Sequence, residues 1–569
     1  MSCRRSSRRI LVVAGVVCAC AAVAALLASR RLGGHAAGGN GAGYGNPVAG
    51  PGKMEPLLLR TPGTTGLLLA TDNLQALITE LRDGPAGRLL HTRSVGSFLS
   101  KLLNNPPEGA VTIEQGIRLG LVVGRSCEAE AGLLVWSVEN DRGPAMGFVA
   151  RVGHEKIQKC LVRVGRRLTP PGQSARRLAA GVGQRLHTLA PEGREGVSWG
   201  SAGEWLVVAS STAGCRELLD RAGMPAEKVP ERLAEAVRAT GEGRLAGFME
   251  ARHVLTAAVA ADLGIADREW FAYVASPLAG GEWAERILLK GRPTNTGIVG
   301  ALRSGGQRPL LASLPNSSLL AVSANIGDGV AFWRGLESIS RSLGRHSDVI
   351  YLRRLAEIAS QAEFEKDLAS QFRGELTLSL VVPPGAAYPQ SLIGAELTRG
   401  GRKKLEPAVG KIMSIGGGTV RSADYRGTRV NWLANKRLDF PMLPSPAYCF
   451  KGDRLVMSTA SVHLKELIAG RGGVWLGKED VARLSRGMLA ARVSLKRTAP
   501  YAVGVARTMG GGELFPEEVR KAAPPIEDVT APLGNLELIV DRWPGGTQAE
   551  LRSPLPIGAL IVAAMLANE

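Results

Sequence analysis

Residues 203–210 read Gly-Glu-Trp-Leu-Val-Val-Ala-Ser, and residues 452–459 read Gly-Asp-Arg-Leu-Val-Met-Ser-Thr. In each stretch an apolar run follows a glycine, which is typical of the second strand of a β-hairpin. A similar segment comes after each run, Arg216-Glu-Leu-Leu219 in the first case and Lys465-Glu-Leu-Ile468 in the second. The same order of hairpin and helix in two distant places indicates an internal repeat.

Two further pairs of segments match at nearly the same separation. Residues 62–72 resemble residues 315–325, and residues 243–249 resemble residues 487–493. The separation changes slowly along the chain, as expected after a tandem duplication with small insertions and deletions. A chain of 569 residues is also longer than one hydrophobic core usually serves. We therefore predict two repeat copies, at residues 55–295 and 306–552.

Each copy is predicted to be α+β, with a largely antiparallel sheet and helices packed on one face. The opening strands are expected at 66–71 and 319–324, and basic amphipathic helices at 154–166 and 402–413. Two more strands are expected before each basic helix, at 132–138 and 146–152 and at 375–381 and 391–397. The first copy also has helical patterns at 74–81 and 95–103.

An anchor is predicted at the N-terminus. Residues 10–28 form an uncharged apolar run of 19 residues, long enough to span a bilayer. The four arginines before this run favour a cytoplasmic N-terminus and an extracytoplasmic body. We assign residues 1–31 to a signal-anchor in the membrane; the alternative is a cleaved signal peptide and a secreted protein. Lipidation near Cys20 stays open.

The anchor is followed by a predicted flexible linker, residues 32–54, because nine glycines fall within residues 33–52. The other end of the chain, residues 553–569, is predicted to be an apolar tail. Its uncharged run at 557–567 is too short to cross a membrane and is expected to dock into a core.

The two hairpin stretches, at 203–211 and 452–460, together with the signal-anchor, resemble an uncharacterised family of bacterial envelope proteins. That family is known mainly as a domain of unknown function. The resemblance covers about residues 57–552. It implies an extracytoplasmic location and supplies no activity.

Three patterns resemble sites for chemistry. Residues 196–200 spell G-x-S-x-G around Ser198, but a nucleophile elbow needs a strand, a turn and a helix, whereas a strand follows here. Residues 472–478 resemble a phosphate-binding loop with Glu479 at the position of the Ser or Thr, which excludes nucleotide binding. The seven histidines show no metal-ligand spacing. No catalytic, cofactor or metal residue is therefore predicted.

Four cysteines would lie outside the cytoplasm, where disulfides form: Cys127, Cys160, Cys215 and Cys449. Cys160 and Cys215 fall on the buried sides of predicted helices, as small apolar residues do. Neither copy repeats a cysteine pair of the other, so a shared disulfide framework is not expected. One bridge stays open, and its pairing cannot be read from spacing.

The excess of basic residues is the one feature of the composition that indicates a binding partner. Six arginines and no acids lie in residues 1–31, so the rest of the chain carries +13 of the net +19. An extracytoplasmic basic body is expected to be attracted to anionic envelope polymers or lipid headgroups. Nucleic-acid binding is not expected, because basic and aromatic residues are not interleaved.

These observations predict a membrane-anchored, non-enzymatic protein for binding or scaffolding. One alternative is a carrier or sensor of lipid or another apolar ligand, which would need a continuous apolar pocket. A remote alternative is a serine hydrolase that uses Ser198.

Overall fold

The computed structural model describes residues between 65 and 554, with gaps at 81–126, 138–144, 190–195, 224–230, 252–259, 383–388, 435–444 and 499–533 and several shorter ones. The predicted anchor at 10–28, the linker at 32–54, the helix at 95–103 and the tail at 553–569, apart from residues 553 and 554, lie outside the described residues. No helix among the described residues is long and apolar enough to cross a bilayer.

The first half of the described chain contains ten strands and three long helices. The strands are β1 (Thr65–Thr71), β2 (Ala131–Ser137), β3 (Ala145–Arg151), β4 (Arg176–Leu178), β5 (Gln184–Thr188), β6 (Ser198–Ala202), β7 (Trp205–Ala209), β8 (Leu245–Glu250), β9 (Ile265–Pro277) and β10 (Trp283–Pro293). The helices are α7 (Ile157–Leu168), α8 (Thr212–Gly223) and α9 (Glu231–Thr240).

The second half follows the short helices α11 (Gly297–Ala301) and α12 (Pro309–Ala312). Its strands are β11 (Ser318–Ile326), β12 (Phe372–Val381), β13 (Gln390–Leu397), β14 (Thr419–Tyr425), β15 (Thr428–Ala434), β16 (Ala447–Phe450), β17 (Arg454–Ser458), β18 (Leu489–Ser494), β19 (Asn535–Trp543) and β20 (Gly546–Ser553). Its helices are α13 (Gly329–Ser342), α14 (His346–Ser360), the π-helix η2 (Phe364–Leu368), the 3-10 helix η3 (Ala369–Gln371), α15 (Gly401–Ser414), α16 (Ser461–Ala469) and α17 (Lys478–Leu484).

The strands follow one another in the same spatial order in both halves. Hydrogen-bonded neighbours in the first half run β4-β5-β6-β7-β3-β2-β1-β8-β9-β10. In the second half they run β14-β15-β16-β17-β13-β12-β11-β18-β19-β20. Every one of these pairs is antiparallel, so the predicted α+β class and the antiparallel character of the sheet are confirmed.

The two matched hairpins also share their turn geometry. Gly203 joins β6 to β7 with φ of 58°, and Gly452 joins β16 to β17 with φ of 60°. A left-handed backbone at this place favours glycine, which has no Cβ to clash. This requirement accounts for the glycine that opens each of the two quoted stretches.

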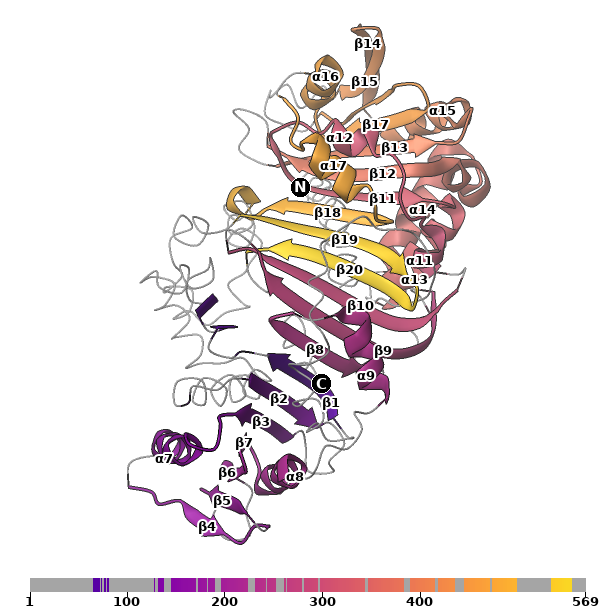
Figure 1. Ribbon diagram of the computed structural model, residues 1–569. Coiled ribbons are helices and arrows are strands. Elements are labelled where there is room, and N and C mark those ends of the chain that lie inside the picture. Colours follow the sequence, from indigo (N-terminus) through magenta and orange to yellow (C-terminus); the bar gives the residue numbers. More distant parts are fainter. Residues whose placement is uncertain are drawn as a thin grey trace.

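The two halves meet where β10 pairs with β20, near the middle of the sheet (Figure 1). Their register runs from Trp283 opposite Ser553 to Lys290 opposite Gly546. One hydrophobic cluster spans this seam and takes Phe271, Ile287 and Leu289 from the first half and Val322, Leu538 and Ala549 from the second. The halves therefore share part of their core.

A buried carboxylate fastens the seam. Glu285 of β10 is 2% exposed, and its side chain accepts hydrogen bonds from the Tyr273 hydroxyl at 2.9 Å and the Ser553 hydroxyl at 3.0 Å. Ser553 belongs to β20, so the second bond crosses from one half to the other. A buried polar group needs such partners, and this need disfavours any other register of β10 on β20.

Helices cover both faces of the sheet, so the prediction of a single helical face is wrong. Against β3 and β7, α7 packs beside Phe148 and Val208, whereas α8 packs on the opposite side, beside Val149 and Val207. In the second half α15 and α16 divide the two faces in the same way. All five residues of β7 are buried, and such an unbroken apolar run is typical of a strand covered on both sides.

Replacing Glu285 by Ala is expected to lower the free energy of unfolding by about 3 kcal/mol, because it leaves two buried hydroxyls without their shared acceptor. Chemical denaturation measures this change. Glu282→Ala provides a matched control, since Glu282 is only partly buried, and it should change stability by less than about 0.5 kcal/mol. Equal effects of the two substitutions would contradict the role of Glu285.

Candidate functional site

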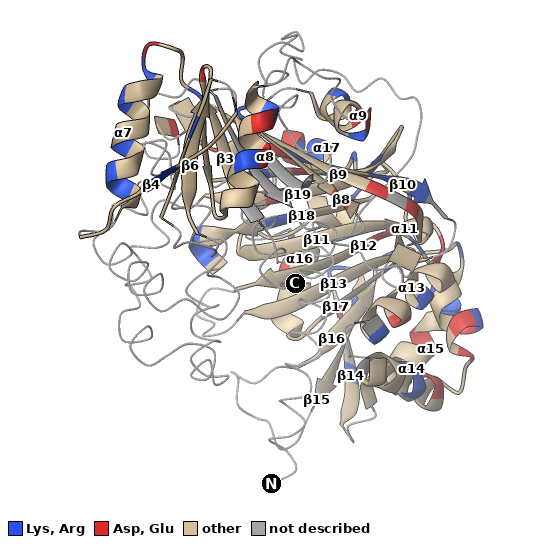
Figure 2. Cartoon of the chain, turned by 90° about the horizontal axis from the view of Figure 1, so that it is seen from below, with Lys and Arg blue, Asp and Glu red and all other residues tan. Residues whose placement is uncertain are grey.

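The exposed side of α7 is a strongly basic surface. Ile157, Cys160, Leu161 and Val164 are buried against the sheet and set which side of the helix faces inward. The opposite side of the helix carries four exposed cations: Lys159, Arg163, Arg166 and Arg167. Figure 2 shows these basic residues along α7.

The β4–β5 hairpin adds two arginines on the side of the sheet that α7 covers. Arg177 lies opposite His187 in the register, and Arg185 is two residues before His187 on β5, so all three share one face. The His187 ring stacks on Trp199, with ring centroids 5.7 Å apart, and Trp199 packs in the cluster that contains α7. The Arg185 guanidinium also donates to the Gln158 side chain of α7.

We name this surface the basic face. It consists of six exposed residues: Lys159, Arg163, Arg166, Arg167, Arg177 and Arg185. Residues 151–189 carry nine Lys and Arg but a single acid, Glu155. The surface is therefore suited to an anionic partner, because little negative charge within the segment opposes it.

His187 responds to this positive charge. Its pKa is lowered by partial burial of the ring and then by the nearby charges of Arg177 and Arg185. The ring is therefore neutral near pH 7. An anion bound over the two arginines would reduce their repulsion and favour the protonated ring.

The corresponding helix of the second half, α15, is less suited than α7 to binding anions. In α15, Arg402 is paired with Glu406 at 3.0 Å, and Asp424 lies on the neighbouring strand β14. Lys403, Lys404 and Lys411 of α15 are exposed. The dense basic character is thus a property of α7 and its hairpin.

Ser198, the serine of the G-x-S-x-G pattern, lies in β6 and is fully buried. Its hydroxyl contacts the hydroxyls of Thr188 and Thr212, both at 2.9 Å, and donates to the Gly196 carbonyl at 3.1 Å. None of these described partners is a base. The strand continues through a turn into β7, as the sequence predicts, so the arrangement is a hairpin and not a nucleophile elbow.

The segment 472–478 is also structural where it is described. Leu476 is 3% exposed and packs in a core cluster, and α17 begins at Lys478. The helix α16 ends before the segment, at Ala469, whereas a phosphate-binding loop follows a strand. The segment therefore follows a helix and does not have the strand-to-loop context of a phosphate-binding loop.

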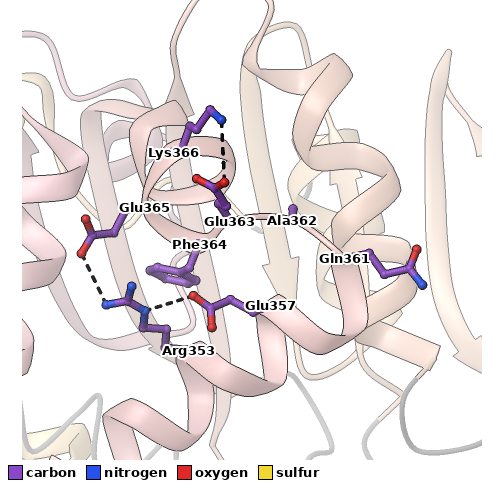
Figure 3. Close-up of a pocket in the computed structure, with 8 residues that line it drawn as sticks. All are labelled: Arg353, Glu357, Gln361, Ala362, Glu363, Phe364, Glu365 and Lys366. Atoms are coloured by element: carbon purple, nitrogen blue, oxygen red, sulfur yellow. Dashed lines mark hydrogen bonds and ion pairs between the residues drawn. The ribbon is translucent and has the colours of Figure 1, made fainter.

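A hollow of about 480 Å³ lies between α14 and the π-helix (Figure 3). Its walls carry paired charges: Arg353 bonds Glu357 at 3.1 Å and Glu365 at 3.4 Å, and its guanidinium lies over the Phe364 ring. A second hollow is lined mainly by apolar side chains but holds only about 10 Å³, roughly the space of one water. Neither hollow is an apolar pocket of ligand size.

No group of three or more His, Cys, Asp or Glu in the described part of the chain is placed to hold a metal ion. Comparison of the chain with protein-family models, with curated proteins and with solved structures found no match. Sequence periodicity located α7, but only the strand register brings Arg177 and Arg185 beside it.

Arg177→Gln is expected to raise the pKa of His187 toward the ordinary value of about 6.5, because one repelling charge is removed. Since the folded pKa lies below the unfolded one, the stabilisation linked to neutral His187 is present above about pH 6.5 and declines at lower pH. NMR titration of the ring protons measures the shift. Arg292→Gln, at an exposed ion pair with Asp267, should leave the His187 titration unchanged.

Proposed function

We propose that the chain is a membrane-anchored, extracytoplasmic, non-enzymatic binding or scaffolding protein whose basic face docks on anionic lipid headgroups. The observation that carries this proposal is the concentration of six exposed cations on α7 and the β4–β5 hairpin. A basic residue near an anionic membrane surface contributes about 1 kcal/mol of attraction. Several such residues on one rigid face are enough to hold a tethered domain.

One exposed apolar side chain favours a membrane over a soluble anionic polymer. Val162 is 55% exposed and lies three residues after Lys159 and four before Arg166. An apolar residue among cations on one helix is typical of helices that rest in the headgroup region. Binding of a hydrated polymer would gain little from this side chain.

The predicted anchor and linker support the same arrangement. A linker of about 20 flexible residues has a reach of about 25 Å. It would keep the body close to the membrane and give the basic face a high effective concentration of lipid headgroups. Weak attraction per residue is then sufficient for stable docking.

We also propose that the halves arose by tandem duplication, with copies at 55–295 and 306–552. The identical strand order and the matched hairpin glycines support this origin. Among the described residues the basic face belongs to the first copy, and β4 and β14 lie at opposite ends of the sheet (Figure 1). Docking through α7 would therefore direct the second copy away from the membrane, free to contact other components of the envelope.

The two alternatives gain no support from the described residues. A carrier of lipid or another apolar ligand would need a larger apolar cavity than either hollow offers. A serine hydrolase would need an accessible Ser198 beside a base, and this hydroxyl is buried among other hydroxyls and a carbonyl.

Hydrogen–deuterium exchange on the full chain in lipid nanodiscs tests the docking. We expect α7 to exchange more slowly in phosphatidylglycerol discs than in phosphatidylcholine discs, and high salt should abolish the difference. The variant K159Q/R163Q/R166Q should lose this protection, because removing about 3 kcal/mol of attraction lowers the docked-to-free ratio about 100-fold.

The variant K403Q/K404Q/K411Q is the matched control, since it removes three exposed lysines from α15. It should keep the protection of α7. Equal protection in both lipids would contradict membrane docking. Protection that appears only after a soluble polyphosphate is added would instead assign the basic face to an anionic polymer.

A reporter enzyme fused after Glu569 tests the location. A reporter that is active only outside the cytoplasm, such as alkaline phosphatase, is expected to be active. Deleting the arginines that precede residue 10 should reduce this activity, because they favour a cytoplasmic N-terminus. Activity of a cytoplasm-specific reporter at the same position would contradict the proposed topology.

A further inference from the structure

Two of the four described cysteines are neighbours in the fold. Cys127, just before β2, is 4% exposed, and Cys160 of α7 is 3% exposed. Both belong to the core cluster under α7, and the Cys160 thiol lies close enough to Cys127 to contribute to the raised pKa of the Cys127 thiol. Neither of them forms a disulfide in this structure.

The other two cysteines provide a contrast. Cys215 of α8 and Cys449 of β16 are also buried and form no disulfide, but they lie in two different clusters, on separate halves of the molecule. Burial alone explains the raised pKa of Cys215, and burial is the leading cause for Cys449. Among the described cysteines, contact between thiols is therefore specific to Cys127 and Cys160.

We propose that Cys127 and Cys160 form a disulfide when the chain folds in an oxidising compartment, and that this bond fixes α7 to the sheet. The oxidising compartment rests on the extracytoplasmic location proposed above. The bond would close a loop that contains β2 and β3. It would hold the helix that carries the basic face even when local packing loosens.

The oxidant is a disulfide, and the chemistry is thiol–disulfide exchange. One cysteine loses its proton, and its thiolate attacks a sulfur of the oxidant, which gives a mixed disulfide and releases one thiol. The thiolate of the second cysteine then attacks the protein sulfur of the mixed disulfide. The new bond joins Cys127 to Cys160, and the two protons leave on two molecules of reduced thiol.

The exchange must take place before α7 is fully docked. Burial, together with the neighbouring Cys160 thiol, raises the pKa of the Cys127 thiol, so little thiolate forms in the folded protein. An external disulfide also cannot reach side chains that are 3% and 4% exposed. A chain folded under reducing conditions should therefore keep both thiols.

Oxidative refolding tests the inference on the full chain in mild detergent. After denaturation, the chain refolds in a mixture of oxidised and reduced glutathione, and free thiols are alkylated before peptide mapping. We expect a peptide pair linked through Cys127 and Cys160, about 2 Da lighter than the sum of the two thiol peptides. Cys215 and Cys449 should be alkylated.

Thermal unfolding with and without reductant gives the second readout. The oxidised chain should unfold several degrees higher than the reduced chain, because the bond restricts the unfolded state. Cys160→Ala should remove this difference, whereas Cys215→Ala, which deletes an equally buried lone thiol, should keep it. Alkylation of both Cys127 and Cys160 after oxidative refolding, or a bridge between other cysteines, would overturn the inference.

This experiment is independent of the cellular location. A linked pair in the refolded protein together with a cytoplasmic reporter would keep the cysteine pairing and remove the extracytoplasmic proposal. Two unlinked thiols together with a reporter that is active outside the cytoplasm would remove the cysteine pairing and keep the extracytoplasmic proposal.

Discussion

The backbone ladder between β10 and β20 is the interaction on which the molecule depends. Without it, each half would end in an edge strand with unpaired N–H and C=O groups, and edges of this kind invite aggregation. The ladder turns both edges into the interior of one sheet and lets Leu289 and Leu538 pack in a single cluster. The bond from Ser553 to Glu285 selects the register of this pairing.

The basic face follows from packing and not from any preference of the arginines themselves. The buried stripe of α7, with Leu161 and Val164, decides the rotation of the helix on the sheet, and the positions on the opposite side face water. Their cations are then held at fixed spacing on a rigid support. The hairpin contributes Arg177 and Arg185 because the pairing of β4 with β5 places them on the α7 side.

Because helices cover both faces of the sheet, α7 buries the two cysteines on its inner side and presents the basic face on its outer side. The space between α7 and the sheet is filled by buried side chains, and Cys127 and Cys160 lie there in one cluster with Phe148 and Val152. The same helix thus carries cations outward and a thiol inward. Ser198 lies in the neighbouring strand β6, where the fold uses its hydroxyl as a partner for Thr188 and Thr212.

Local patterns in the sequence determined the hairpins at Gly203 and Gly452 and the amphipathic helices α7 and α15, because neighbours along the chain decide turns and helical faces. The sequence also determined the repeated order of elements and the basic composition. Three features required the tertiary structure: the pairing of β10 with β20, the two helical faces, and the contacts of Cys127 with Cys160 and of Arg185 with Gln158. Backbone hydrogen bonds are alike for nearly every residue, so the sequence of a strand does not specify which other strand it pairs with. Only the combined burial of apolar side chains on both faces selects one arrangement.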